Sequence, residues 1–203
     1  HRRLSNGDDK PYELNISWWS AMEDSSRDAK RFQYERFILS QLLVMALKGV
    51  PAFYLPALLA SENDIKSFSM TGQRRDLNRE KFKSENLSAV LNNPESNANK
   101  NLKYLRNAMD VRSELKQFHP CSQMKCLSKG RSDIVVIKRG KGPESVFAIH
   151  NMTENKINYQ LNDNDLPKII DNDFNTHDFL TSTKYNCKNI SLDPFQVIWL
   201  SAL

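Results

Sequence analysis

The segment between residues 28 and 60 limits the possible folds more than any other part of the chain. Apolar residues recur at helical spacing through "DAKRFQYERFILSQLLVMAL", Asp28 to Leu47, and Gly49 then ends the pattern. A short apolar run, Val50 to Leu55, follows at once and is bounded by prolines, as in a strand that is buried on both faces. A helix, a tight turn and a buried strand in immediate succession predict an α/β fold.

The remaining patterns divide the chain at about residue 120. Apolar residues recur at helical spacing over residues 78–91 and 98–115. After His119-Pro120 the pattern changes to that of short strands. We expect these strands at residues 134–138, 145–150, 156–161, 179–181, 189–192 and 196–200, with an Asn/Asp-rich connection at 162–173. The sequence therefore predicts one unit over residues 1–120 and an antiparallel β domain over residues 121–203.

Composition narrows the class of protein. The chain has 203 residues, of which 39% are hydrophobic and 26% are charged, as in an ordinary globular protein. Its net charge of +5 comes from interspersed residues rather than from a basic tail, and Lys/Arg clusters with interleaved aromatics are missing. The longest apolar run, residues 37–47, is too short to cross a bilayer, and the first ten residues lack a signal-peptide centre. We expect no nucleic-acid or membrane partner and a cytoplasmic protein.

Two further features bear on what the chain contains. Cys121, Cys126 and Cys187 are an odd set without zinc-ribbon spacing, which predicts free thiols, no metal site and no cofactor. The chain begins with His1, and we interpret it as a piece of a longer protein.

The stretch "TGQRRDLNRE", Thr71 to Glu80, carries three arginines within ten residues. A charge run of this kind is most often a solvated loop that leads into a helix. Arginine also offers five donors in a rigid fork, which suits anions and vicinal hydroxyls held in one orientation. The residues alone leave the solvated loop and the ligand site as alternatives.

Several segments together carry a resemblance to a known family. They are "PYELNISWWSAM", "KGVPAFYLPALLASENDIKSFSMTGQRRDLNRE", "FHP", "FAIHNMT" and "LDPFQVIWL". In this combination and order they resemble the C-terminal part of the sucrose phosphorylase-like enzymes of glycoside hydrolase family 13, in the α-amylase superfamily. The resemblance extends through nearly all of the chain.

The resemblance implies the C-terminal end of a (β/α)8 barrel, followed by the amylase-type β-sandwich domain. Val50 to Leu55 would be the eighth barrel strand, and Thr71 to Glu80 would return over the face where such barrels carry their active sites. Arg75 matches an arginine that holds the glucosyl hydroxyls in this family. Tyr12, Glu13, Asn63 and Asp64 would lie on the same rim and touch the sugar or the acceptor.

Three positions depart from the family pattern. The family has Gln where this chain has Glu13, and Lys10 and Pro11 also differ, so the resemblance does not fix sucrose as the substrate. Lys10, with Arg2 or Arg3, would suit an acidic acceptor, since ammonium and guanidinium groups pair well with carboxylates. A solvated N-terminal segment is the equal alternative.

The activity implied is retaining α-glucosyl transfer to phosphate, which gives α-glucose 1-phosphate. The family's nucleophile, acid/base and third carboxylate would all lie upstream of residue 1, so the chain offers no catalytic residue. We expect an α-glucoside and inorganic phosphate as substrates and, in the full-length protein, a possible homodimer. Open alternatives are another family 13 glycosidase or transglucosidase, and an inactive product that serves as a carbohydrate-binding or structural module.

A first prediction follows from the missing acids. Purified residues 1–203, incubated with phosphate and a panel of α-glucosides, should release no glucose 1-phosphate, because losing one member of such a catalytic set removes several powers of ten in rate. Release above a buffer control would contradict this reading and would require catalytic acids within the chain.

Overall fold

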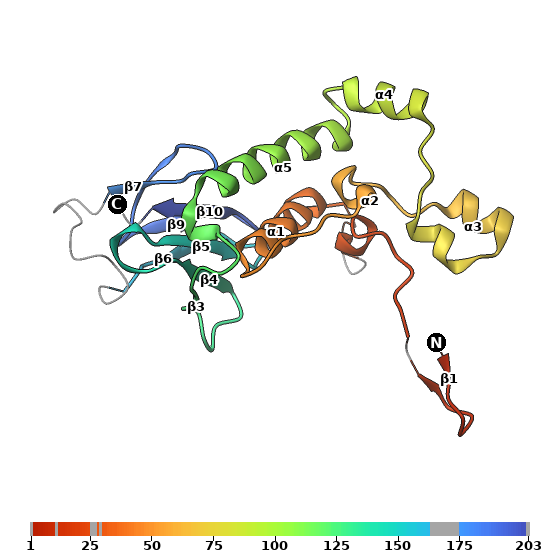
Figure 1. Ribbon diagram of the computed structural model, residues 1–203, viewed down its shortest axis with the longest axis horizontal. Coiled ribbons are helices and arrows are strands. Elements are labelled where there is room, and N and C mark those ends of the chain that lie inside the picture. Colours follow the sequence, from red (N-terminus) through yellow and green to blue (C-terminus); the bar gives the residue numbers. More distant parts are fainter. Residues whose placement is uncertain (1, 11, 25–27, 29, 163–174, 202–203) are drawn as a thin grey trace.

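The computed structural model describes residues 2–10, 12–24, 28, 30–162 and 175–201 (Figure 1). The Asn/Asp-rich connection expected at residues 162–173 therefore lies almost entirely outside the described residues. The central layer of the molecule is a four-stranded antiparallel sheet in the order β10-β5-β4-β3. The strands are β3 (Met124–Cys126), β4 (Ile134–Arg139), β5 (Val146–Asn151) and β10 (Val197–Ser201).

The register of the sheet sorts its side chains onto two faces. Ile137 lies opposite Ala148, which in turn lies opposite Trp199. One position away, Val136 and Ile149 are paired in the same manner. Because side chains alternate along a strand, the first set faces the helices and the second set faces the remaining strands.

Helices α1 (Gln33–Ala46) and α5 (Asn97–Glu114) reach the sheet from one side (Figure 1). They share one hydrophobic core with it, in which Leu42, Met45 and Leu105 are fully buried beside Phe118 and Trp199. The rings of Phe118 and Trp199 lie 4.7 Å apart between centroids. The sheet therefore covers these apolar side chains of the two helices.

Two small strand pairs accompany the sheet: one packs on its other face, and the other lies beside β10. β6 (Ile157–Tyr159) pairs with β9 (Ile190–Leu192), and β7 (Asn175–His177) pairs with β8 (Lys184–Asn186). The strand predicted at residues 179–181 is wrong, because this segment is a turn. The carboxylate of the preceding Asp178 accepts hydrogen bonds from the Leu180 amide and the Thr181 hydroxyl, which favours a turn over a ladder.

The predicted eighth strand is also wrong. Residues 50–54 have no regular structure, and Leu55–Leu58 forms the short helix α2 with a proline in its first turn. Val50 is 79% exposed and Tyr54 is 56% exposed. A parallel strand forms only beside hydrogen-bonded neighbours, and the described residues include no neighbouring strand at this position.

The segment that follows α2 lies away from the sheet (Figure 1). It consists of α3 (Ile65–Thr71), the 3-10 helix η2 (Arg74–Asn78) and α4 (Ser84–Asn92). The helix predicted over residues 78–91 thus begins six residues later. Three further 3-10 turns are η1 (Ser20–Met22), η3 (Lys116–Phe118) and η4 (Gly142–Glu144).

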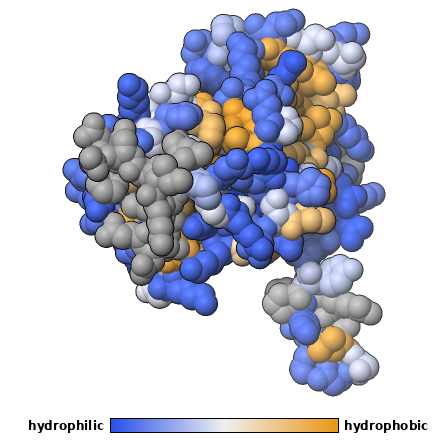
Figure 2. Space-filling view, turned by 60° about the vertical axis from the view of Figure 1, so that its left-hand side comes forward, coloured by the Kyte–Doolittle hydropathy of each residue, from blue (hydrophilic) through white to orange (hydrophobic). Residues whose placement is uncertain are grey.

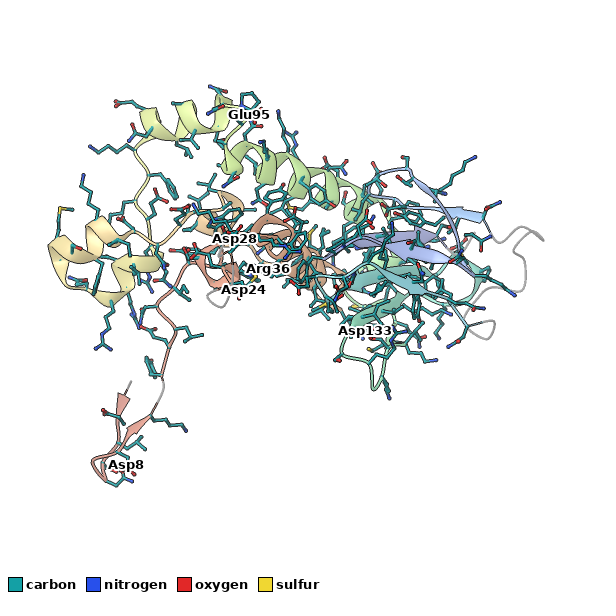
Figure 3. All side chains as sticks on the ribbon, turned by 180° about the vertical axis from the view of Figure 1, so that it is seen from behind. Asp8, Asp24, Asp28, Arg36, Glu95 and Asp133 are labelled. Atoms are coloured by element: carbon teal, nitrogen blue, oxygen red, sulfur yellow. The ribbon has the colours of Figure 1, made fainter. Side chains whose placement is uncertain are left out.

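The N-terminal residues form a small hairpin, β1 (Arg2–Arg3) with β2 (Asp9–Lys10). It stands apart from the body of the molecule, as the space-filling view also shows (Figure 2). The labelled Asp8 marks the turn of this hairpin, far from the labelled residues around α1 (Figure 3). The hairpin therefore has little contact with the rest of the described chain.

Two arginines close the C-terminal end of α1. The Arg139 side chain is fully buried, and its guanidinium donates to the carbonyls of Ala46 at 2.9 Å, Leu47 at 2.6 Å and His119 at 3.0 Å. Arg112 donates to the carbonyl of Met45 at 2.9 Å and to that of Gly49, also at 2.9 Å. The last carbonyls of a helix have no intrahelical partner, so these contacts satisfy them and place positive charge at the negative end of the helix dipole.

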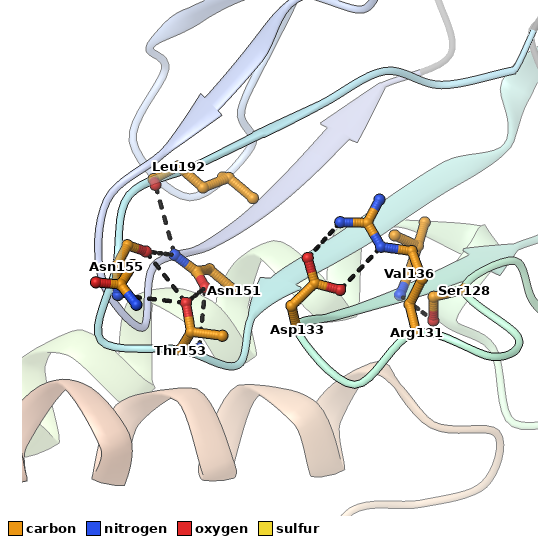
Figure 4. Close-up of polar contacts among 8 residues, drawn as sticks. All are labelled: Ser128, Arg131, Asp133, Val136, Asn151, Thr153, Asn155 and Leu192. Atoms are coloured by element: carbon orange, nitrogen blue, oxygen red, sulfur yellow. Dashed lines mark hydrogen bonds and ion pairs between the residues drawn. The ribbon is translucent and has the colours of Figure 1, made fainter.

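A buried amide fixes the corner after β5. The Asn151 side chain donates to the carbonyl of Asn155 at 2.7 Å, and it accepts from the amide and hydroxyl of Thr153 (Figure 4). It also donates to the carbonyl of Asp193 at 2.8 Å. Nearby, Arg131 forms an ion pair with Asp133 (Figure 4). The corner brings the loop before β6 and the loop after β9 together.

The three cysteines are free, as predicted, with Cys121 and Cys126 exposed and Cys187 buried. No helix among the described residues is long and apolar enough to span a membrane.

His150 in β5 makes stability depend on pH. The side chain is fully buried, and burial lowers its pKa to about 4, although a contact to the Val135 carbonyl at 3.2 Å opposes the shift. In the unfolded chain the His150 imidazole therefore becomes protonated below about pH 6.5, whereas in the folded chain it becomes protonated only near pH 4. This contribution to stability is complete above about pH 6.5 and is lost as pH falls toward 4.

We predict that His150→Gln removes this pH dependence. Between pH 7 and pH 5 the wild-type free energy of unfolding should fall by about 2 kcal/mol more than that of the variant, measured by urea unfolding at each pH. His177→Gln, at an exposed position in β7, is the matched control and should keep the wild-type slope. Equal slopes in wild type and His150→Gln would contradict the assignment.

Candidate functional rim

The residues singled out in the sequence meet where the chain before α1 passes the segment after α2. Asn63 makes the link, because its side-chain oxygen accepts from the Ser17 amide at 2.7 Å and its own amide donates to the Ser20 hydroxyl at 3.1 Å. Ser17 and Ser20 were not among the predicted site residues. Only their position beside Trp18 and Trp19 in the sequence could have drawn attention to them.

Asp64 begins helix α3 and holds η2 against it. Its carboxylate accepts from the Ser67 amide at 2.8 Å, and its own amide donates to the Leu77 carbonyl at 2.8 Å. Hydrogen bonds from Ser67 lower the pKa of this carboxyl, so it stays ionised at the helix N-terminus. Asp64 therefore shapes the segment, and its carboxylate is already engaged.

The turn between α3 and η2 is fixed locally. Gly72 ends α3 with a φ of 66°, the left-handed conformation that glycine adopts without strain. The Thr71 hydroxyl donates to the Asp76 carboxylate at 2.6 Å and accepts from the Gln73 amide at 3.1 Å. These bonds set the direction of the backbone at Arg75.

Arg75 and Glu13 form a second contact between the two segments. The Nε of Arg75 lies 3.0 Å from Oε1 of Glu13, and its Nη2 lies 3.3 Å from Oε2. The side chains are 54% and 39% exposed, respectively. The hydrogen bonds that Arg75 donates to Glu13 lower the pKa of Glu13 and raise the pKa of Arg75, so both groups are charged at neutral pH.

The other two predicted residues lie differently. Tyr12 is next to this ion pair in sequence and is 63% exposed. Lys10 belongs to the β1–β2 hairpin, which stands apart from α3 and η2 (Figure 1). The structure thus brings Glu13, Asn63, Asp64 and Arg75 onto connected segments, and it does not bring Lys10 beside them. We name the connected segments, residues 12–20, 61–64 and 71–79, the candidate rim.

Two open hollows flank the candidate rim. One of about 500 Å³ is lined by polar residues that include Asn63 and Asp64. The other, of about 350 Å³, is mainly apolar and is lined by Leu14, Trp18 and Tyr54 among others. Of the adjacent tryptophans, Trp19 packs inward at 4% exposure and Trp18 is half exposed at 39%. The rim can therefore offer polar donors beside an aromatic surface.

The described residues contain no group of three or more His, Cys, Asp or Glu side chains that could hold a metal ion. The buried titratable groups His150 and Asp178 belong to the sheet, where each is engaged with the backbone. The carboxylates of Glu13 and Asp64 in the rim are each engaged in hydrogen bonds within the chain.

Comparison with known proteins finds phosphorylases among the relatives of this chain. The chain is 31% identical over 145 residues to a glucosylglycerate phosphorylase of Allomeiothermus silvanus and 23% identical over 155 residues to a sucrose phosphorylase of Streptococcus mutans. These alignments cover 71% and 76% of this chain. The resemblance to the sucrose phosphorylase-like enzymes of glycoside hydrolase family 13 is confirmed.

The chain spans only part of these relatives, 26% of the first and 29% of the second. Among solved structures, trehalose-6-phosphate hydrolase of Bacillus licheniformis is similar with a TM-score of 0.60 at 16% identity, over 85% of this chain and 39% of that one. This likeness confirms the fold class, the end of a (β/α)8 barrel followed by an antiparallel β domain. No protein-family model matches the chain.

Proposed function

We propose that the chain is the C-terminal part of a retaining α-glucoside phosphorylase, which transfers a glucosyl unit to phosphate and gives α-glucose 1-phosphate. The observation that carries the proposal is the sequence similarity to two phosphorylases that are named for different glucosides. Under this proposal residues 1–120 complete the catalytic barrel and residues 121–203 form the appended β domain, with the shared core of α1, α5 and the sheet joining the two.

The chemistry would be divided between this chain and the upstream part of the protein. A carboxylate nucleophile would attack the anomeric carbon, a second acid would protonate the leaving oxygen, and phosphate would then release the glucosyl unit. This chain would supply the groups that hold the sugar in place. Such positioning is a large part of catalysis, because a bound substrate reacts only when its atoms are aligned.

Arg75 is the residue that we assign to the sugar. Two of its five N–H donors are engaged by Glu13, so three remain for hydroxyl groups. Asn63 and Asp64 would set the position of the segment that carries Arg75, and Tyr12 would border the same site.

The alternative of a carbohydrate-binding module in the β domain is not favoured. It requires a planar strip of exposed aromatic rings. Phe147 and Trp199 are fully buried, and Phe179 is partly buried against the core shared with the helices. The aromatic residues of the β strands therefore stabilise the fold.

In the full-length protein, Arg75→Ala should lower kcat/KM for phosphorolysis by at least about tenfold, because charge-assisted contacts to the sugar are lost. The measurement is the initial rate of glucose 1-phosphate release over a range of glucoside concentrations. Arg74→Ala removes the neighbouring exposed charge and is the matched control, which should keep near wild-type kinetics. Wild-type kinetics in Arg75→Ala would show that this arginine does not hold the substrate.

A further inference from the structure

The Arg75–Glu13 pair has a geometry that a simple surface ion pair lacks. Two parallel hydrogen bonds join the two planar groups, and they link segments that are 62 residues apart in the chain. A bidentate contact fixes both the position and the plane of the guanidinium. The N–H groups that remain on Arg75 therefore point in a defined direction.

The pair also has no net charge. The Glu13 carboxylate stays ionised because Arg75 stabilises it, with a smaller contribution from the positive charge of Arg79. An unpaired guanidinium attracts phosphates and carboxylates. A guanidinium that is paired with a carboxylate attracts such anions less, because the pair is neutral, and its remaining N–H groups still donate to hydroxyls. The chemistry of the site thus depends on which partner Arg75 keeps.

We propose that Glu13 is a positioning and specificity-determining residue, which orients Arg75 and masks its charge so that this part of the rim accepts neutral sugar hydroxyls and disfavours anionic groups. The inference rests on the proposed function, because it takes Arg75 as a sugar-binding residue. An acidic acceptor would then be bound by groups other than Arg75.

The test compares two sugars of the same ring, neutral glucose and the carboxylate glucuronate, by calorimetric titration of the full-length protein. In wild type, glucose should bind more tightly than glucuronate. Glu13→Gln keeps one hydrogen bond to Arg75 and removes the negative charge, so the affinity ratio should shift toward glucuronate by about three- to tenfold. In about 0.5 M salt this shift should shrink, because charges at exposed sites are screened.

Two controls separate charge at this point from general effects. Glu13→Asp keeps the carboxylate and should keep the preference for glucose, while Glu85→Gln removes an exposed charge in the first turn of α4 and should change nothing. An unchanged ratio in Glu13→Gln, or an equal shift in Glu85→Gln, would overturn the inference. Phosphorolysis is assayed separately, so binding that follows the predicted ratios without glucose 1-phosphate release would contradict the proposed function alone.

Discussion

The buried guanidinium of Arg139 is the contact on which the layered body depends. It extends from β4 into the end of α1, where it satisfies helix carbonyls that would otherwise be buried without donors. The same group bonds the His119 carbonyl, which begins the passage from the helices to the sheet. Phe118 packs beside it, with the Arg139 guanidinium 5.4 Å from the ring centroid. Helix, connection and sheet are thereby held at one point.

The candidate rim is built in a different way. It is joined by hydrogen bonds of exposed or half-buried groups, chiefly those of Asn63 and the Arg75–Glu13 pair, rather than by a core of its own. Exposed contacts of this kind add little stability, so the rim relies on α1 and α2 for its position. Apolar side chains that remain at the surface, such as Val50, Tyr54 and Leu55, lie in the segment that leads to the rim. A rim of this kind suits a binding role in a larger assembly.

Much of the body could be predicted from the sequence because apolar periodicity records burial. α5 was placed to within one residue at each end, and β4, β5 and β10 were placed nearly as well. The apolar pattern failed to predict the structure at Val50 to Leu55. An apolar run shows that a segment can be buried, but it does not show whether neighbouring strands are present to pair with it. The pattern also failed after Asp178, because the Asp178 carboxylate accepts the hydrogen bond of the Leu180 amide, which lies in the expected strand.

The site was only partly predictable. The family resemblance placed Glu13 and Arg75 on one rim, but no spacing in the sequence shows that residues 62 positions apart form a bidentate pair. The sequence also does not show that Lys10 lies on a separate hairpin, because the pairing of β1 with β2 depends on a turn rather than on a charge pattern. Contacts between distant segments are set by tertiary packing, which a local pattern does not contain.

The most direct test of the account is a crystal structure of the full-length protein with a non-hydrolysed α-glucoside bound. The account predicts that the Arg75 guanidinium lies within about 3 Å of a glucosyl hydroxyl while Glu13 holds its other edge. A glucoside bound elsewhere, with Arg75 in contact with solvent only, would contradict the claim that this rim holds the sugar.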